Sequence, residues 1–571
     1  MHSKALLTSL VLSALLAVSL LAADGQQDET RSGDHTQWGR TSSRNNVITD
    51  AAVEKKIPLQ WHIGEFDFDS GAWKPEKSRN IKWVARLGTN AFGNPAVANG
   101  KVFVGTNNDA AYLARFPKDK VDLGVLLCLD ERDGEFLWQY SAAKLSGGDK
   151  HDFAAIGICS SPLVIGDRLW LVTNRCEVVC LDTQGFHDGE NNGPVKDEAS
   201  ENKDEADVIW RFDMIKELGV SPLFMANCSV TAMGQWLLVS TSNSSDEFGK
   251  TIPNPKAPSF VVIHKETGKL RWKDDTTGAH ILHGQWSSPA VHLEIETAIF
   301  TPGDGWLHGI SGSWLDLSAA DAITSASVPF HRWRFDCNEK TALWKQAGRG
   351  TRNSIIATPV VHEDQLFIAT GQSPELGDGP GTLWCIDLIK AVENRNDVSE
   401  SLVFNPNHGA GRSPIPQRRL QAADIEAGDI IKPNQQSALK WKYTGADTNG
   451  NRKLDVDEQM HRSISTVAVK DGLVIAPDFT GIVHCLDAAT GKPHWTHDMQ
   501  AGCWGSPLIV GNRVYLGNDH GKVIVFALAK DKKILAENDM DQTICGTPII
   551  ANNTLYIATK ARLFAIAMKP E

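Results

Sequence analysis

Residues 506–519, SPLIVGNRVYLGND, form a short apolar run, a turn at Gly511–Asn512 and a second run rich in β-formers. The same pattern recurs as SPLVIGDRLWLVTN from Ser161, TPVVHEDQLFIATG from Thr358 and TPIIANNTLYIATK from Thr547. Related copies begin at Asn94, Val230, Ser288 and Thr466, which makes eight copies. The two closest starts, Thr466 and Ser506, are 40 residues apart. Eight copies of one two-stranded unit indicate a repeat architecture.

Each copy continues into a third strand that ends near an acidic turn, and usually into a fourth strand that carries Trp, as in LDAATGKPHW at residues 486–495. The equivalent tryptophans are Trp138, Trp210, Trp272, Trp441 and Trp495, while Trp333 and Trp344 compete for the place in the fourth repeat. We expect these side chains to pack between neighbouring repeats, because large aromatic surfaces dominate such burial. Four strands followed by a restart define one blade, so the sequence predicts an all-β, eight-bladed β-propeller of four-stranded antiparallel blades.

The eighth blade has only three strands before the last residue, Glu571. The segment NIKWVARLG, Asn80 to Gly88, precedes the first copy and carries Trp83 at the place that a fourth strand requires. Pairing it with the last repeat would protect both sheet edges. The sequence therefore predicts a ring that is closed by the N-terminal strand.

The amino-acid composition is that of a globular protein. Of 571 residues, 42% are hydrophobic and 22% are charged, as in an ordinary globular protein with a sizeable core. The net charge is -12 and the basic residues are dispersed, which argues against nucleic acid as a partner. The chain divides into an apolar N-terminal stretch at 1–23, an extension at 24–79 and the propeller at 80–571.

Residues 1–23, MHSKALLTSLVLSALLAVSLLAA, combine a basic Lys4 with a long apolar run, as a secretory signal peptide does. The alternative is an uncleaved anchor, because the run approaches the ~20 residues that span a bilayer. No second run of that length follows. We expect a periplasmic or secreted protein with no stable membrane span after signal removal.

Ten cysteines are present, and four of them share one context: LCLD, VCLD, WCID and HCLD at Cys128, Cys180, Cys385 and Cys485. A small buried thiol in a strand explains this pattern. No CxxC pair, haem-attachment motif or pair of adjacent cysteines occurs.

The segment DTNGNRKLDVDE, residues 447–458, resembles the ligand spacing of an EF-hand loop. Its six ligand positions are filled by Asp447, Asn449, Asn451, the carbonyl of Lys453, Asp455 and Glu458. Arg452 stands where the loop normally has Gly, and a non-Gly residue with positive φ weakens binding. The sequence predicts a Ca²⁺ site in an insertion at 446–460 between blades five and six; the alternative is an acidic, solvated turn.

Residues just before each first strand should form a ring near the axis. Counting back from the Pro of each repeat, or from its equivalent, gives Phe92, Cys159, Cys228, Trp286, Ile356, Ile464, Trp504 and Cys545. A disulfide between Cys159 and Cys228 is conceivable if their Cα atoms lie within ~7 Å. Apolar walls with a few polar groups are typical of a ligand site, with Trp286, Trp504, Arg352, Asn353, His283 and His461 as candidate cofactor-binding residues. The alternative is that these side chains only plug the channel.

The turn-and-Trp segments LDAATGKPHW, HKETGKLRW and LDERDGEFLW resemble the repeats of the pyrroloquinoline quinone (PQQ) propellers. Longer stretches, LHGQWSSP, GRGTRNSIIATPVV, GPGTLWCID and HRSISTVAV, are similar to a group of exported bacterial PQQ-like propellers. The resemblance covers about residues 80–570. It implies a superfamily that contains quinoprotein alcohol dehydrogenases and also noncatalytic propellers that bind proteins.

The resemblance implies that a dehydrogenase would hold PQQ between a Trp floor and a disulfide of adjacent cysteines, beside Ca²⁺ and a basic Asp. This chain lacks the adjacent cysteines, and no local motif identifies a catalytic residue. We therefore expect a noncatalytic scaffold or ligand-binding protein with a protein or small molecule at the propeller face. The alternatives are a PQQ-dependent dehydrogenase that oxidises alcohols or sugars, and a carbohydrate-binding propeller with Trp286 and Trp504 on an exposed rim.

Overall fold

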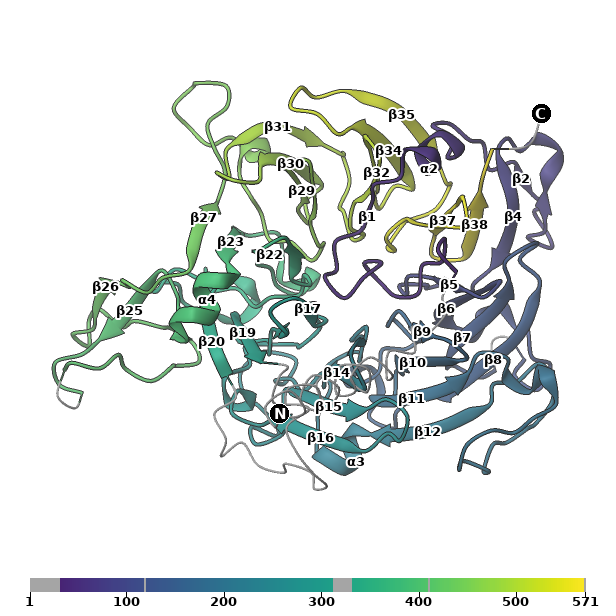
Figure 1. Ribbon diagram of the computed structural model, residues 1–571, viewed down its shortest axis with the longest axis horizontal. Coiled ribbons are helices and arrows are strands. Elements are labelled where there is room, and N and C mark those ends of the chain that lie inside the picture. The colour runs from purple at the N-terminus through teal and green to yellow at the C-terminus, as the bar shows by residue number, and fades with distance from the viewer. Residues whose placement is uncertain (1–30, 118–119, 312–330, 409–410, 569–571) are drawn as a thin grey trace, which may run out of the picture.

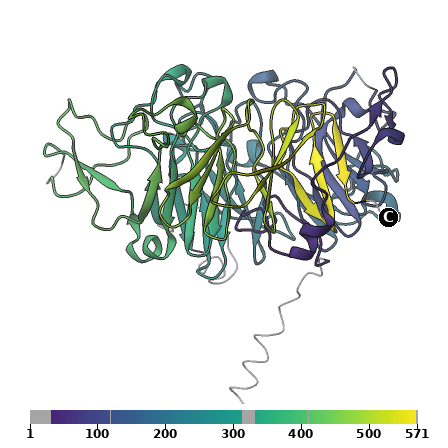
Figure 2. The same cartoon turned by 90° about the horizontal axis from the view of Figure 1, so that it is seen from above.

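The protein is a ring of eight antiparallel sheets around a central axis, as the computed structural model of residues 31–117, 120–311, 331–408 and 411–568 shows (Figure 1). Seen from the side, the ring is a thick disc (Figure 2). The predicted eight-bladed propeller is therefore confirmed. None of the helices in the described part of the chain has the length and hydropathy that spanning a bilayer requires.

The first four blades follow one another along the chain, each beginning with its innermost strand. Blade one contains β5 (Ala96–Ala98), β6 (Lys101–Asn107), β7 (Leu123–Asp130) and β8 (Phe136–Ala143). Blade two contains β9 (Leu163–Ile165), β10 (Arg168–Val172), β11 (Glu177–Asp182) and β12 (Val208–Asp213). Blade three contains β13 (Thr231–Met233), β14 (Trp236–Ser240), β15 (Phe260–His264) and β16 (Leu270–Asp274). Blade four contains β17 (Ala290–His292), β18 (Thr297–Phe300), β19 (Trp306–Ser311) and β20 (His331–Asp336).

The last four blades repeat this plan. Blade five contains β21 (Val360–His362), β22 (Gln365–Ala369), β23 (Leu383–Asp387) and β27 (Leu439–Tyr443). Blade six contains β28 (Ala468–Lys470), β29 (Leu473–Pro477), β30 (Ile482–Asp487) and β31 (Pro493–Asp498). Blade seven contains β32 (Leu508–Val510), β33 (Arg513–Gly517), β34 (Lys522–Ala527) and β35 (Ile534–Asp539). Blade eight contains β36 (Ile549–Ala551), β37 (Thr554–Ala558), β38 (Arg562–Ile566) and β4 (Ile81–Arg86).

Additional short elements decorate the ring. The strands are β1 (Val47–Ile48), β2 (Glu65–Phe66), β3 (Trp73–Lys74), β24 (Asn396–Asp397), β25 (Ser401–Phe404) and β26 (Ile430–Pro433). The α-helices are α2 (Ala51–Lys56), α3 (Met214–Leu218) and α4 (Leu388–Asn394). The 3₁₀ helices are η1 (Pro75–Lys77), η2 (Asn108–Ala110), η3 (Gly148–Lys150), η4 (Gly185–Asp188), η5 (Gly278–His280), η6 (Gln346–Gly348), η7 (Pro374–Leu376) and η8 (Val456–Glu458). The β25–β26 hairpin projects from the rim of the disc (Figure 1).

The ring closes as the sequence predicts. Strand β4 pairs antiparallel with β38, and Trp83 lies opposite Ala565. The N-terminal strand thus supplies the outer edge of the last blade, and this pairing joins the two ends of the propeller sequence.

The repeated cysteines lie opposite the repeated tryptophans in neighbouring strands. Cys128 lies directly opposite Trp138 in the next strand, and Cys485 lies opposite Trp495. The same pairing joins Cys180 to Trp210 and Cys385 to Trp441. A small side chain at this position leaves room for the neighbouring indole. All ten cysteines are unpaired and buried, and Trp333, opposite Gly309, fills the fourth-strand place of blade four.

Several fourth-strand tryptophans also bind the following blade. The Trp441 indole donates a hydrogen bond to the Ala488 carbonyl at 2.9 Å. Gly491, with φ of 70°, lies flat against this indole, so that a Cβ there would come within 2.5 Å of Trp441 Cε3. Gly134 on Trp83 and Gly268 on Trp210 repeat the contact. The Gly of the TGK and DGE turns is therefore required by close packing between blades.

The extension before β4 includes a segment that lies within the ring. Residues 33–48, hereafter the axial segment, lie inside the ring and contact the innermost strands of the blades in order (Figure 1). The contacts are Gly33 with Asn552, His35 with Val97, Thr36 with Val164, Gln37 with Thr231, Ser42 with Val291, Ser43 with Val361, Asn45 with Val469, and Asn46 with Ile509. Blades eight, one, two, three, four, five, six and seven are thus bonded to one peptide.

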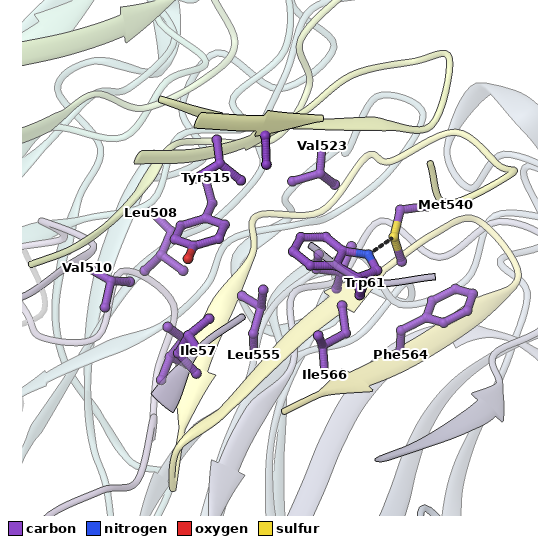
Figure 3. Close-up of a cluster of buried hydrophobic side chains, with 14 of the residues drawn as sticks. Ile57, Trp61, Leu508, Val510, Tyr515, Val523, Met540, Leu555, Phe564 and Ile566 are labelled. Carbon is purple, nitrogen blue, oxygen red and sulfur yellow. Dashed lines mark hydrogen bonds between the residues drawn. The ribbon is translucent and has the colours of Figure 1, made fainter. Parts of the chain in front are cut away.

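Two further features anchor this N-terminal region. Arg44 is 1% exposed and donates hydrogen bonds to the carbonyls of Trp38, Ser229 and Pro289 at 2.7–2.8 Å. Farther along, Ile57 and Trp61 pack into the core between blades seven and eight, where the Trp61 indole meets Met540 Sδ at 3.1 Å (Figure 3).

Substitution of Gly491 tests the packing between blades. We expect Gly491→Ala to lower the unfolding temperature by several degrees, because the new Cβ collides with Trp441. Gly472→Ala is the matched control, because Gly472 has φ of 74° but no heavy atom within 4 Å of an added Cβ. Equal losses in thermal unfolding would show that backbone strain alone, and not contact with Trp441, fixes this glycine.

Candidate functional site

A closed belt of hydrogen bonds surrounds the axis. One residue just before each innermost strand belongs to it: Asn94, Ser161, Ser229, Ser288, Thr358, Thr466, Ser506 and Thr547. The backbone N–H of each donates to the side-chain oxygen of the next, at 2.9–3.3 Å for the first seven. The N–H of Thr547 donates to the Asn94 side chain and completes the circle. Six of these residues precede Pro, which favours the extended backbone that the belt uses.

A cavity of about 370 Å³ lies on the axis at the belt. Seven belt residues, all except Ser161, line it together with the residue two positions before each of them, and Trp38 of the axial segment lines it as well. The axial segment bonds to residues that follow the belt in each blade, so it closes the channel at one end. The cavity, hereafter the axial chamber, is therefore open toward one face of the disc.

Seven of the eight ring positions predicted from the sequence line the axial chamber: Phe92, Cys159, Trp286, Ile356, Ile464, Trp504 and Cys545. The eighth prediction, Cys228, is wrong by one residue, because Asn227 lines the chamber instead. Blade three has Val230 where most blades have Pro, so the repeat was aligned one position late. Cys228 is 1% exposed and its Sγ accepts the Ser240 N–H at 3.3 Å, so the conceivable disulfide with Cys159 does not form.

Aromatic side chains gather on two sides of the chamber. On one side, the rings of Trp504 and Phe92 lie 5.9 Å apart. On the other, Trp286 stacks on Phe224 at 6.3 Å with an interplanar angle of 14°, and Phe153 contacts Phe224. Trp286 is only 9% exposed, so the expectation of an exposed aromatic rim for carbohydrate is wrong for this residue. Its ring lines the chamber.

The four polar candidates lie outside the chamber lining. Arg352 is fully buried and pairs with Asp336 at 3.1 Å. Asn353 accepts a hydrogen bond from Gln372 at 2.9 Å. Both side chains are held by buried partners, Asp336 and Gln372, and neither belongs to the chamber lining.

The two histidine candidates differ in their surroundings. His283 is 2% exposed and its ring stands perpendicular to that of Trp286, with the centroids 5.7 Å apart, and burial lowers its pKa. His461 Nδ1 lies 2.9 Å from Asp478 Oδ2, and this hydrogen bond raises the pKa of His461. Neither histidine reaches the chamber lining.

The lining carries little charge. Glu375, at the exposed mouth beside Ser373, is the one charged side chain among the described lining residues, which include no Lys, Arg or His. Burial raises the pKa of Cys159 and of Cys545 to about 12, so both remain neutral thiols. Trp38, Phe224 and Glu375 were missed from sequence, because they lie in irregular segments that carry no repeat signal.

The loop at 447–458 joins β27 to β28, apart from the residues that line the chamber. Asp447 accepts hydrogen bonds from the backbone of Gly450, Asn451 and Arg452, and Arg452 has φ of 66°. Glu458 is 2% exposed and accepts from the Thr448 and Asn449 backbone. Within the described ranges no three His, Cys, Asp or Glu side chains are gathered as metal ligands. Ca²⁺ binding by this loop stays a prediction.

Comparisons with known proteins support the fold. A family model described as outer membrane protein assembly factor BamB matches residues 441–531 and 480–569. A europium-containing methanol dehydrogenase is 11% identical, with 92% of this chain and 89% of that chain covered and a TM-score of 0.51. The quinohemoprotein alcohol dehydrogenase of Comamonas testosteroni is 10% identical, with 96% and 82% covered and a TM-score of 0.52.

BamB from Moraxella catarrhalis is 14% identical, with 80% of this chain and 94% of that chain covered and a TM-score of 0.42. No curated protein has a significant sequence match to this chain. At such low identities the structural likeness shows the propeller fold alone.

A calcium titration tests the loop. If the loop binds Ca²⁺, saturating Ca²⁺ should raise the unfolding temperature of the wild type, because a ligand of the folded state stabilises it. Asp447→Asn should remove most of that rise, since it keeps an oxygen for the turn but removes a ligand charge. Asp457→Asn, an exposed carboxylate outside the six ligand positions, should respond as the wild type does. No rise in the wild type would identify the loop as a solvated turn.

Proposed function

Because the chain is a PQQ-repeat β-propeller, we propose that it is a noncatalytic scaffold whose axial chamber binds a small molecule or a side chain of a partner protein. The observation that carries this proposal is the chamber itself. It has aromatic walls, a polar belt and an end closed by the axial segment. Concave, mainly apolar sites with a few fixed polar groups are where proteins bind ligands.

The composition of the lining argues against catalysis. General acid–base chemistry needs positioned groups with suitable pKa values, and nucleophilic catalysis needs an activated side chain. The lining offers one exposed carboxylate, two neutral thiols, and hydroxyls whose oxygens already accept backbone hydrogen bonds. His283 and His461 lie outside it.

The same lining does not fit PQQ. This cofactor carries three carboxylates, which need cationic or multiple N–H partners when they are removed from water. The described lining has no Lys, Arg or His, and its one charge is the carboxylate of Glu375. Arg352, a candidate cofactor ligand, is already paired with the buried Asp336. A PQQ-dependent dehydrogenase is nevertheless the rival function, because two proteins with this fold are alcohol-oxidising enzymes by name.

The proposal includes export. The predicted signal peptide at 1–23 lies outside the described residues, so this part rests on the sequence pattern of a basic residue followed by an apolar run. A periplasmic or secreted location agrees with the similarity of residues 441–569 to an outer membrane protein assembly factor.

A neutral dye tests the chamber as a binding site. N-phenyl-1-naphthylamine fluoresces in apolar surroundings, and we expect saturable binding of one dye per chain. Trp504→Ala should weaken binding at least about fivefold, because it removes a large apolar wall. Trp73→Ala is the control, since Trp73 is a half-buried indole outside the lining. Equal dye affinity in both variants would contradict the proposal.

The rival function has its own test. Purified protein incubated with PQQ and Ca²⁺ should show no bound-cofactor absorbance and no dye reduction with alcohols or sugars. Stoichiometric cofactor together with substrate-dependent dye reduction would replace the scaffold proposal by a dehydrogenase.

A further inference from the structure

Six aromatic side chains line the axial chamber: Trp38, Phe92, Phe153, Phe224, Trp286 and Trp504. Its one charged lining residue in the described chain is an acid, Glu375. We propose that the chamber binds a small organic cation, a methylated ammonium ion that also carries a hydroxyl group. This inference rests on the proposed function, because it takes the chamber to be a binding site and names the chemistry of its ligand.

The aromatic walls of the chamber favour a cationic ligand. The faces of indole and phenyl rings carry negative potential and attract cations, and rings that surround a quaternary ammonium group form its usual protein site. Here rings come from both sides of the chamber, with Trp504 and Phe92 on one and Trp286 and Phe224 on the other. A methylated ammonium group has an apolar surface, so it can enter such walls at a lower desolvation cost than the ammonium of lysine.

The charge at the mouth of the chamber and on the whole chain also favours a cationic ligand. Glu375 is exposed at the mouth and its carboxylate accepts a hydrogen bond from Ser373, which holds the negative charge at the entrance. The whole chain carries a net charge of -12, which favours the approach of cations. An anionic ligand would meet the opposite field and would find no Lys, Arg or His in the described lining.

Two cationic side chains near the chamber, the buried Arg44 and the half-buried Lys144, are held by other partners. Arg44 lies 5.6 Å from the Trp38 ring centroid, and three backbone carbonyls accept its hydrogen bonds. Lys144 pairs with Asp152 and with the carbonyls of Phe153 and Ile156. Neither side chain is part of the lining, so neither presents its donors to a ligand in the chamber.

The polar belt accounts for the hydroxyl group of the ligand. Six hydroxyls of the belt line the chamber, those of Ser229, Ser288, Thr358, Thr466, Ser506 and Thr547, and each uses one lone pair to accept a backbone N–H. Each hydroxyl retains a hydrogen and a second lone pair. Asn227 is another residue of the chamber lining, and its Oδ1 is buried without a hydrogen-bond partner in the described structure. A ligand hydroxyl could satisfy these groups.

A matched pair of ligands isolates the charge. Choline and 3,3-dimethyl-1-butanol have almost the same shape and the same hydroxyl, but only choline is a cation. By isothermal titration of the full chain, we expect choline to bind at least about tenfold more tightly, which is the size of a desolvated cation–π contribution. Equal or tighter binding of the neutral alcohol, or no binding of choline, would overturn the inference.

Substitutions in the lining test whether choline binds in the axial chamber. Trp504→Leu, which keeps an apolar wall but removes the ring, should weaken choline binding about tenfold and leave the affinity for the neutral alcohol within about twofold. Glu375→Gln should weaken choline binding about threefold, and Glu393→Gln, an exposed acid outside the lining, should not change it. Unchanged choline affinity in both Trp504→Leu and Glu375→Gln would place the site elsewhere and contradict the inference.

Failure of the cation inference can be distinguished from failure of the proposed function. If N-phenyl-1-naphthylamine occupies the chamber but choline neither binds nor displaces it, the chamber is a ligand site and only the cation inference fails. If the neutral dye also fails to bind, the proposed function fails with it.

Discussion

Eight backbone N–H groups, each bonded to the side-chain oxygen of the next blade, form the constraint on which the rest of the structure depends. The belt fixes the spacing of the innermost strands around the axis. Because every belt residue is both donor and acceptor, no single blade can shift without leaving a buried polar group unsatisfied. The belt also sets the polar character of the chamber, since its hydroxyls lie where the channel would otherwise be apolar.

The axial segment converts the channel into a chamber. It contacts all eight blades and it precedes β4, the strand that completes blade eight. The N-terminal region therefore binds both at the centre of the ring and at its closing edge. Contacts such as Asn46 with Ile509 join residues far apart in sequence, so this closure belongs to the slow, non-local part of folding. The result is a site with one entrance and walls drawn from several blades.

Repetition made the fold predictable. Eight copies of a two-stranded unit determined the number of blades, and Trp83 in an otherwise unassigned strand identified the closing edge. The repeated Cys and Trp positions were understood as core packing, which the register of Cys128 with Trp138 confirms. Seven chamber positions followed from the same repeat.

The features that the sequence did not predict lie outside the repeated units. The axial segment has an irregular backbone whose hydrogen-bond partners come from every blade, so no local pattern in residues 33–48 reveals it. Phe224 and Glu375 reach the chamber from connections between strands. Arg352 and His461 lie close in sequence to predicted ring positions. In the structure they pair with the buried carboxylates of Asp336 and Asp478 and do not line the chamber. Pairing of this kind depends on tertiary contacts that spacing does not encode.

Hydrogen exchange of the native protein tests the central claim, that the axial segment closes the channel, most directly. The amides of Val164, Val291 and Val361 donate to the axial segment, whereas those of Ser161, Ser229 and Thr466 donate within the belt. We expect both sets to exchange equally slowly, because both are buried and hydrogen-bonded in one cooperative unit. Rapid exchange of the first set while the belt stays protected would show that the axial segment leaves the channel, and would contradict the account.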